Sequence, residues 1–238
     1  MTKDLSRVAG PSLRALPFFR PDDGAIPRLS DQQRQRLLGI ATRIELRARG
    51  FVYKEHAAAG AVFICGEGAV KSFRDLPSGR RRVVGFLFRG DIFGLAENGR
   101  DVNSTQATMP SMCYRLPLEQ LVPILLQDPA LEFNMMLKIT HELRQSQRHN
   151  IVISSRSAKV RLAACLRMLE KSPLPPTLPG TIPVPMTRTD IADYLGLTIE
   201  SVSRATRELT TTGVIKFNGT RAVRVLNREK FEALATVL

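Results

Sequence analysis

The spacing of hydrophobic and polar residues divides the chain into segments with different predicted secondary structure. Residues 1–29 contain four prolines and an Asp-Asp-Gly turn, so we expect an irregular N-terminal extension. Ser30 and Gln33 then form the capping-box pattern of a helix start. This pattern predicts a short helix that ends near Ala41.

The region 44–118 is predicted to be β-structure. Short runs rich in β-branched and aromatic residues, such as AVFIC and RRVVGFLF, are separated by glycines. Short strands with glycine turns are typical of a β-roll, jelly roll or barrel. The segment Asp75–Gly79 has the composition of a turn between two of these strands.

A long helix is predicted from Pro129 to about Ile153, with Asp128 as its N-cap. Its apolar positions repeat at a rough heptad spacing that Ser146 and Gln147 interrupt. Such a stripe is compatible with packing on the chain's own domain and with pairing to a second copy. Because the helix is long and joins two regions, we favour self-pairing. The candidate interface residues are Leu131, Met135, Ile139, Leu143 and Ile153.

Another helix is predicted after the polar break at 154–157. Its apolar residues have the i, i+3, i+4, i+7 spacing of one helix face. These residues are Leu162, Cys165, Leu166 and Leu169. Residues 172–185 then contain six prolines, and they are predicted to form a loop because proline has no N–H for a helix or a sheet.

The segment after this loop has the pattern of a helix-turn-helix. Thr187 and Asp190 form a capping box that opens a short helix. The turn Gly196–Thr198 follows, with glycine where φ can be positive, and its threonine can cap a second helix. Gly213 is placed to end that second helix. Two helices joined by a three-residue turn that contains glycine are typical of DNA-binding proteins.

One side of the second helix carries the residue types that read DNA bases. Val202 and Leu209 can anchor the helix inward, which leaves four polar residues outside: Glu200, Ser203, Arg204 and Arg207. Arg can donate two parallel hydrogen bonds to guanine, Glu accepts from cytosine, and Ser fits a thymine or adenine edge. An isolated Glu–Arg pair four residues apart would be an ordinary surface ion pair. After a complete turn motif, base reading by Glu200, Ser203 and Arg204 is favoured.

A β-hairpin is predicted directly after the second helix. Asn218-Gly219 between runs of alternating apolar residues is a strong hairpin signal, and a hairpin here would be the wing of a winged helix-turn-helix. Lys216, Arg221 and Arg224 supply charge for phosphate contact. The alternative is a hairpin whose basic side chains are merely solvated.

Composition narrows the class of protein. The 238 residues carry 35 Lys and Arg against 22 Asp and Glu, a formal charge of +13 that favours nucleic acid or an anionic membrane as partner. No apolar run approaches the ~18 residues of a membrane span, and the N-terminus lacks a secretory signal pattern. Cys65, Cys113 and Cys165 have neither a disulfide-framework spacing nor a zinc spacing. We therefore expect a basic, soluble, cytoplasmic protein of one or two domains.

These motifs resemble those of the CRP/FNR superfamily of bacterial transcription regulators. MTRTDIADYLGLTIESVSRATRELTTTGVI is similar to the superfamily's helix-turn-helix signature. VFICGEGAVKSFRDLPSGRRRVVGFLFRGDIFGL resembles its cyclic-nucleotide-binding-type β-roll. The resemblance implies an α+β fold with four parts. They are an extension over 1–29, a β-roll domain over 30–128, a dimerisation helix over 129–154 and a winged helix-turn-helix domain over 155–238.

The recognition helix is similar to that of the FNR/FixK branch. There, Glu-x-x-Ser-Arg is associated with TTGAT-type palindromes, whereas the cyclic-AMP branch usually has glycine where Ser203 stands. The resemblance implies a homodimer that places two recognition helices ~34 Å apart in successive major grooves. Hydroxyl and basic groups near helix starts and on the wing are candidates for phosphate contact. They are Thr187, Arg188, Thr189, Thr198, Ser201, Arg207, Lys216 and Arg221.

The chain departs from the cyclic-nucleotide binders of the superfamily. Those proteins hold the ribose with a Gly-Glu pair, whereas Gly94 is followed here by Leu95. They grip the cyclic phosphate with an Arg next to a small hydroxyl residue, whereas Asn103–Thr105 has no Arg beside it. An apolar side chain cannot accept a hydroxyl, and Asn cannot neutralise a phosphate. We therefore expect no control by cyclic nucleotide.

Other cofactors are not indicated either. FNR binds an iron–sulfur cluster through four cysteines, but residues 1–64 contain no cysteine and three scattered thiols cannot supply a four-cysteine shell. Each cysteine lies in an apolar run, which predicts burial. The histidines are expected at the surface or at an interface rather than on haem: His56, His141 and His149. The chain is similar to FixK-type regulators, which often act without a bound cofactor.

An effector-gated sensor that uses haem, cyclic nucleotide or a thiol is the alternative, and an absorbance spectrum with a ligand titration would distinguish it. An enzyme is not supported, because no Ser-His-Asp, zinc or P-loop spacing is present. The expected partners are double-stranded DNA, a second copy of the chain and, for an activator, RNA polymerase. No membrane partner is expected.

Overall fold

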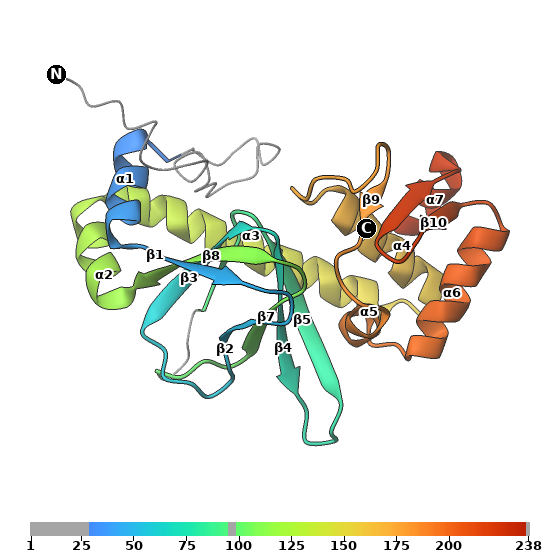
Figure 1. Cartoon of the computed structure of the whole chain (residues 1–238), viewed down its shortest axis with the longest axis horizontal. Coiled ribbons are helices and arrows are strands. Elements are labelled where there is room, and N and C mark those ends of the chain that lie inside the picture. The colour runs from blue at the N-terminus through green and yellow to red at the C-terminus, as the bar shows by residue number, and fades with distance from the viewer. Residues whose placement is uncertain (1–28, 95–98, 237–238) are drawn as a thin grey trace. The chain divides into compact units, whose positions relative to one another are not determined.

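The computed structural model describes residues 29–94 and 99–236, and it has the expected α+β architecture (Figure 1). Of the N-terminal extension, only Leu29 is among the described residues. Leu95 lies outside them. The first elements are α1 (Asp31–Ile40), β1 (Thr42–Leu46), β2 (Phe51–Tyr53), β3 (Ala61–Glu67), β4 (Ala69–Asp75) and β5 (Arg81–Phe88). They are followed by β6 (Ile92–Phe93), β7 (Ser104–Ala107), β8 (Ser111–Pro117) and α2 (Leu118–Gln127).

The remaining elements include the long helix and the predicted winged helix-turn-helix. They are α3 (Pro129–Ser154), α4 (Ala158–Glu170), β9 (Ile182–Pro183), α5 (Arg188–Leu195), α6 (Ile199–Thr211), β10 (Ile215–Asn218), β11 (Ala222–Val225) and α7 (Arg228–Ala235). Among the described helices, none is both long and apolar enough to cross a membrane.

The strands form three sheets. Two belong to the β-roll, with strand orders β1-β8-β3-β6 and β2-β7-β4-β5, and the third is the small sheet β10-β11-β9. The predicted β-roll and C-terminal hairpin are therefore confirmed. The proline-rich segment is not entirely a loop, because Ile182 and Pro183 pair with Val223 and Ala222. Proline is tolerated there because β9 is an edge strand.

The chain divides into two compact units. The first contains the described residues up to Val70 together with Leu87–Glu142, and the second contains Lys71–Phe86 together with Leu143–Leu238. The second unit therefore joins most of the β4–β5 hairpin, residues 71–86, to the helix-turn-helix.

The core of the first unit is built where helices cover the β1-β8-β3-β6 sheet. Leu37 of α1, Leu121 of α2 and Leu131 of α3 are buried in one cluster with strand residues such as Ile64 and Leu116. Figure 1 shows α1 and α2 together at one end of this sheet. The start of α3 is thus an integral part of this core.

A buried lysine fixes α3 to the β-roll. The Lys138 ammonium is fully buried and lies 3.1 Å from Asp91 Oδ1 and 2.9 Å from Glu142 Oε1. Asp91 Oδ2 also accepts a hydrogen bond from the Phe88 N–H at 2.8 Å, which orders the turn before β6. Burial alone would lower the pKa of Lys138, but the two carboxylates raise it, so the lysine is charged.

The second unit is organised around α4. Its buried side chains include all four residues predicted from the sequence: Leu162, Cys165, Leu166 and Leu169. Helix α4 contacts α5, α6 and α7, so it supports both helices of the turn motif. The three cysteines of the chain are buried free thiols, as predicted, and burial raises the pKa of Cys165 to about 12.

Candidate nucleic-acid interface

Helix α5 begins at the predicted capping box and ends at the predicted glycine. The Thr187 hydroxyl accepts a hydrogen bond from the Asp190 N–H, and the Asp190 carboxylate accepts one from the Thr187 N–H. Gly196 is left-handed, with φ 64°, and its N–H donates to Ala192. Local hydrogen bonds therefore define both ends of α5.

The end of α5 has a second support that the sequence pattern did not reveal. Arg161 of α4 donates from Nη1 to the carbonyl of Leu195 at 2.9 Å, where a helix leaves its last carbonyls without partners. The same guanidinium reaches the carbonyl of Gly196. Arg161 thus ties the turn between α5 and α6 to the core.

Helix α6 has the inward and outward sides that the sequence predicted. Thr198 caps it by accepting a hydrogen bond from the Ser201 N–H at 3.2 Å. Val202 and Leu209 are each 1% exposed, whereas Arg204 is exposed. The buried side chains fix the rotation of α6 about its axis, so its polar side faces solvent.

The three candidate base-reading residues lie on this solvent side. Glu200 and Arg204 are exposed and Ser203 is half-buried. Arg204 Nη2 lies 3.3 Å from the Ser201 hydroxyl, which steadies the guanidinium without burying it. The N–H of Glu200 itself and the Thr198 hydroxyl lower the pKa of Glu200, so it is an acceptor at neutral pH.

Most of the candidate phosphate contacts are also exposed, but two hydroxyls are already engaged. Thr187 donates its hydroxyl hydrogen to Asp190 at 2.8 Å, and Thr198 bonds Ser201 at 3.1 Å. Two hydroxyls that the sequence analysis named as candidates for phosphate contact therefore hold the N-terminal turns of α5 and α6 in place. The exposed candidates are Thr187, Arg188, Thr189, Thr198, Arg207, Lys216 and Arg221, and Ser201 is half-buried.

The wing is the hairpin of β10 and β11. Its register pairs Lys216 with Arg224, and Gly219 adopts φ 67° in the connection. Arg224 donates to the carbonyl of Pro179 at 3.2 Å, so this wing arginine steadies the proline-rich segment. Lys216, Arg221 and Arg224 are all exposed on the wing.

In the β-roll, the two hydroxyl residues Ser104 and Thr105 are buried. The Ser104 hydroxyl accepts a hydrogen bond from the Glu55 N–H at 3.0 Å. Thr105 is fully buried and lies opposite Tyr53 in the β2–β7 register, and burial raises the pKa of Tyr53 to about 12. Tyr53 also packs on Phe63 and Phe93, with ring centroids 5.2 and 6.1 Å apart. Aromatic side chains thus fill this part of the roll.

The candidate dimer residues differ in how exposed they are in the single chain. Leu131 and Met135 are 0% and 7% exposed because they pack in the core of their own chain. Ile139 and Leu143 are 40% and 58% exposed, and Ile153 is half-buried. No cluster of three or more His, Cys, Asp or Glu able to hold a metal ion occurs within residues 29–94 and 99–236.

Comparison with known proteins agrees with this architecture. Residues 43–128 match the cyclic nucleotide-binding domain model, and residues 160–234 match the Crp-like helix-turn-helix domain model. A β-roll followed by a helix-turn-helix with an exposed polar recognition helix defines a DNA-binding transcription regulator. The chain belongs to the CRP/FNR family of such regulators.

Individual relatives cover most of the chain. The nitrogen fixation regulation protein FixK of Bradyrhizobium diazoefficiens is 32% identical over 200 residues, which are 82% of this chain and 83% of FixK. The transcriptional activatory protein AadR of Rhodopseudomonas palustris is 30% identical over 200 residues, 82% of each chain. The solved structure of FixK2 from Bradyrhizobium japonicum matches with a TM-score of 0.74 at 31% identity, over 82% of this chain and 97% of that one. These relatives are transcription regulators rather than enzymes.

Proposed function

We propose that this regulator binds a TTGAT-type palindrome as a homodimer and needs neither cyclic nucleotide nor an iron–sulfur cluster. The observation that carries the proposal is the solvent side of α6. There, Glu200, Ser203 and Arg204 stand on a helix whose rotation is fixed by buried Val202 and Leu209. In a helix-turn-helix, the N-terminal residues of the recognition helix contact base edges in the major groove, and these three residues lie in the N-terminal part of α6.

The proposed base contacts follow from the chemistry of these groups. The Arg204 guanidinium donates to guanine O6 and N7, and the Glu200 carboxylate accepts from cytosine N4. Ser203 contacts a neighbouring adenine or thymine edge. Arg188, Arg207, Lys216 and Arg221 contact phosphates and supply affinity without sequence preference.

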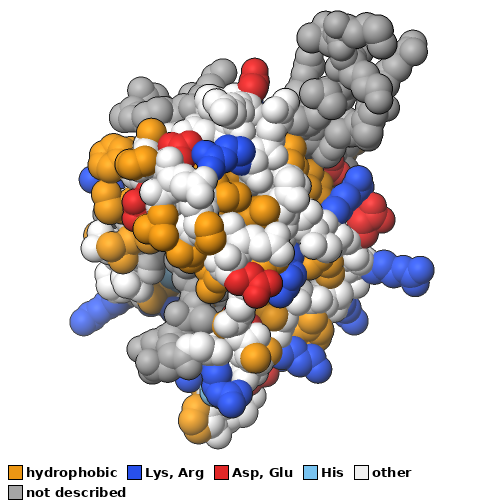
Figure 2. All heavy atoms as spheres, turned by 90° about the vertical axis from the view of Figure 1, so that its left-hand side faces the viewer, with side chains coloured by type: hydrophobic (Ala, Val, Ile, Leu, Met, Phe, Trp, Pro, Cys, Tyr) orange, Lys and Arg blue, Asp and Glu red, His pale blue; other side chains and the backbone are white. Residues whose placement is uncertain are grey.

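The proposed dimer forms along the exposed apolar side of α3. Phe133, Met136 and Leu143 are 52%, 53% and 58% exposed, and with Thr140 they have the alternating three- and four-residue spacing of a coiled-coil seam. Figure 2 faces the side where Figure 1 places α1 and α2, and it shows hydrophobic side chains exposed there. Since Leu131 and Met135 are buried in the core, we place Leu143 in this seam and Ile139 and Ile153 beside it.

Independence from cyclic nucleotide is supported by the burial of Ser104 and Thr105 in the roll. Ser104 already accepts from the Glu55 N–H, and Thr105 is buried against Tyr53. A cyclic phosphate would have to replace these contacts without an arginine beside it, which leaves its charge unneutralised. As a DNA-binding regulator the protein acts where the bacterial chromosome lies, in the cytoplasm, and as an activator it would contact RNA polymerase.

The test is fluorescence anisotropy of the purified protein on a TTGAT–ATCAA palindrome and on a scrambled duplex of equal length. The absorbance spectrum is recorded first, and no ligand is added. Selective binding by a colourless dimer is the expected result. Selective binding that appears only with cyclic nucleotide, haem or a change of thiol state would support the effector-gated alternative. A monomer in sedimentation equilibrium would contradict the dimer.

A further inference from the structure

One contact of the helix-turn-helix comes from a distant part of the sequence. In the second unit, the ammonium group of Lys71 on β4 forms an ion pair and hydrogen bond with Oδ1 of Asp190 on α5. These residues are 119 positions apart in the chain, and they are only 8% and 7% exposed. The pair is therefore almost withdrawn from water, unlike the Lys159–Glu208 pair of the same unit, whose side chains are 40% and 52% exposed.

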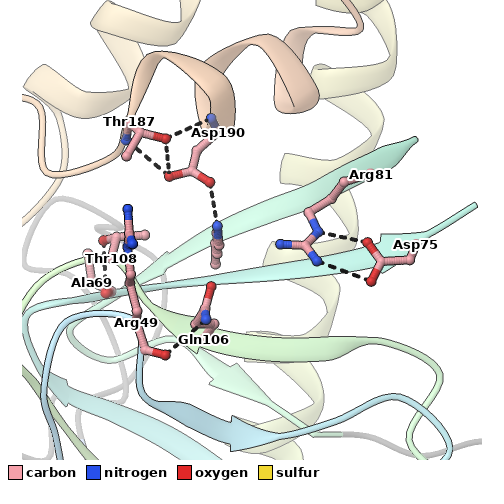
Figure 3. A network of polar contacts seen from close by, with 9 residues as sticks. Arg49, Ala69, Asp75, Arg81, Gln106, Thr108, Thr187 and Asp190 are labelled. Atoms are coloured by element: carbon pink, nitrogen blue, oxygen red, sulfur yellow. Dashed lines mark hydrogen bonds and ion pairs between the residues drawn. The ribbon is translucent and has the colours of Figure 1, made fainter. Parts of the chain in front are cut away.

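Asp190 serves two partners at once. Its Oδ2 accepts hydrogen bonds from the N–H and the hydroxyl of Thr187 (Figure 3). Its Oδ1 is bound to Lys71. Burial alone would raise the pKa of Asp190, but the hydrogen bonds from Lys71 and Thr187 lower it. The carboxylate is thus ionised at neutral pH, and Lys71 supplies its compensating charge.

The position of this carboxylate matters for DNA. Asp190 lies in the first turn of α5, directly after exposed Thr187, Arg188 and Thr189. The N–H groups of such a turn attract a phosphate, but an uncompensated carboxylate in the same turn repels it. Because the site is poorly hydrated, this repulsion is screened less than it would be at an open surface.

The hairpin that carries Lys71 is held along the length of α5. Phe86 packs on Tyr194 with ring centroids 5.0 Å apart. At the end of the helix, a Cβ on Gly196 would meet the Arg82 guanidinium. Lys71 also lies 5.4 Å from the centre of the Phe73 ring. These contacts give the ammonium a defined position, so its charge acts on the first turn of α5 specifically.

We propose that Lys71 is a positioning residue for DNA binding: by compensating Asp190, it keeps the first turn of α5 able to receive a DNA phosphate. This inference rests on the proposed function, because it assumes that α5 meets the DNA backbone. The contribution is electrostatic and independent of base sequence, so it is expected on specific and scrambled duplexes alike.

The proposal predicts opposite effects on DNA affinity for removal of the positive and of the negative member of the pair. We would compare Lys71→Met, Asp190→Asn and the double variant with the wild-type chain on the palindrome and the scrambled duplex. Lys71→Met should lower affinity for both duplexes about tenfold, because it leaves the carboxylate facing phosphate. Asp190→Asn should not lower affinity, because the lysine charge remains, and the double variant should bind as the wild type does. Lys71→Arg should retain binding.

Two controls separate this effect from loss of fold. Lys159→Met removes the lysine of the exposed pair and should change affinity less than twofold. Circular dichroism and titration of the DNA-competent fraction correct each affinity for unfolded protein. If Lys71→Met does not fold, Lys71→Gln gives the same comparison, since glutamine keeps a donor for Asp190 without the charge.

The outcomes are distinguishable. Equal losses for Lys71→Met and Asp190→Asn would show that the pair acts only through packing, and they would overturn the inference. Unchanged affinity of Lys71→Met, with normal wild-type binding, would overturn it too and leave the proposed function intact. A wild-type chain that binds neither duplex would overturn both.

Discussion

The imidazole of His149 lies flat on the phenol ring of Tyr194, with ring centroids 3.8 Å apart and 13° between the planes. His149 belongs to α3 and Tyr194 to α5, so the stack fixes the long helix to the helix-turn-helix within the second unit. Burial lowers the pKa of His149 to about 4, and the charge of Arg82 acts in the same direction. Nε2 has no hydrogen-bond partner in the part of the chain that the structure describes. A protonated imidazole is therefore unfavourable at this position.

The stack predicts an acid-sensitive fold. Because the pKa of His149 is lower in the folded chain than the unfolded value of about 6.5, the unfolded chain binds the extra proton between these two values. The contribution of His149 to the free energy of unfolding is therefore fully present above pH ~6.5. It is lost as the pH falls toward 4, by at most about 1.4 kcal/mol per pH unit. The free energy of unfolding, measured with urea at several pH values, should depend less on pH for His149→Gln than for the wild-type chain. His56→Asn, which changes an exposed histidine in a left-handed conformation, is the comparison variant.

Arg204→Ala should lower affinity for the palindrome by about 1–3 kcal/mol and relax the preference at the guanine. The reason is that the alanine leaves guanine O6 and N7 without their donors. Anisotropy on the palindrome and on duplexes substituted at that base pair measures both effects. Arg43→Ala, at an exposed arginine of the first unit, is the matched control. An equal loss on specific and random DNA would contradict base reading by Arg204.

Arg221→Ala should weaken binding to every sequence and flatten the dependence of affinity on salt. A lost phosphate contact releases one fewer counterion, which reduces the slope of log K against log salt by about 0.9 for duplex DNA. The measurement is a salt titration on palindromic and scrambled duplexes. An unchanged slope would count against a wing–phosphate contact.

Leu143→Asp should convert the proposed dimer to monomer and lower DNA affinity as a consequence. Leu143 is 58% exposed in the single chain, so the substitution introduces a charge into the proposed seam without opening the core. Sedimentation equilibrium measures the mass. Leu178→Asp, at a loop leucine that is 44% exposed, should remain a dimer. If both variants keep the wild-type mass, the interface lies elsewhere.

Lys138→Met should destabilise the fold by roughly 3–5 kcal/mol, because it removes the lysine from a buried ion pair with Asp91. Urea unfolding gives the free energy directly. The exposed pair supplies the contrast, since Lys159→Met should cost about 0–1 kcal/mol. Similar values for the two lysines would mean that the buried cluster is not a stabilising anchor.

Several elements follow from the sequence because their signals are local. The capping boxes at Ser30–Gln33 and Thr187–Asp190 close within one helical turn, and both are present. Gly196 and Gly213 stand where the chain needs positive φ, and Asn218-Gly219 connects the wing strands. Hydrogen bonds between near neighbours and steric limits on φ do not depend on distant residues, which is why the winged helix-turn-helix could be predicted.

Other elements depend on tertiary contacts and were not predicted. Helix α2 forms despite Pro123, with Leu121 packed in the core, and α7 is anchored by buried Phe231. The buried side of α3 includes the polar residues Asn134 and Lys138. Hydrophobicity alone therefore did not show that Leu131 and Met135 pack in the core of their own chain rather than against a second copy. A polar residue is buried only where a distant partner compensates it.

The sequence by itself determined the DNA-binding module and the family, because the residues that carry them lie within short segments. Only the tertiary structure decided which side of α3 remains free, and which distant charges meet, as Lys138 meets Asp91 and Lys71 meets Asp190. An ion pair between residues far apart in the chain leaves no periodic signal. Its partners are chosen by the geometry of the folded chain and by the cost of burying a charge alone.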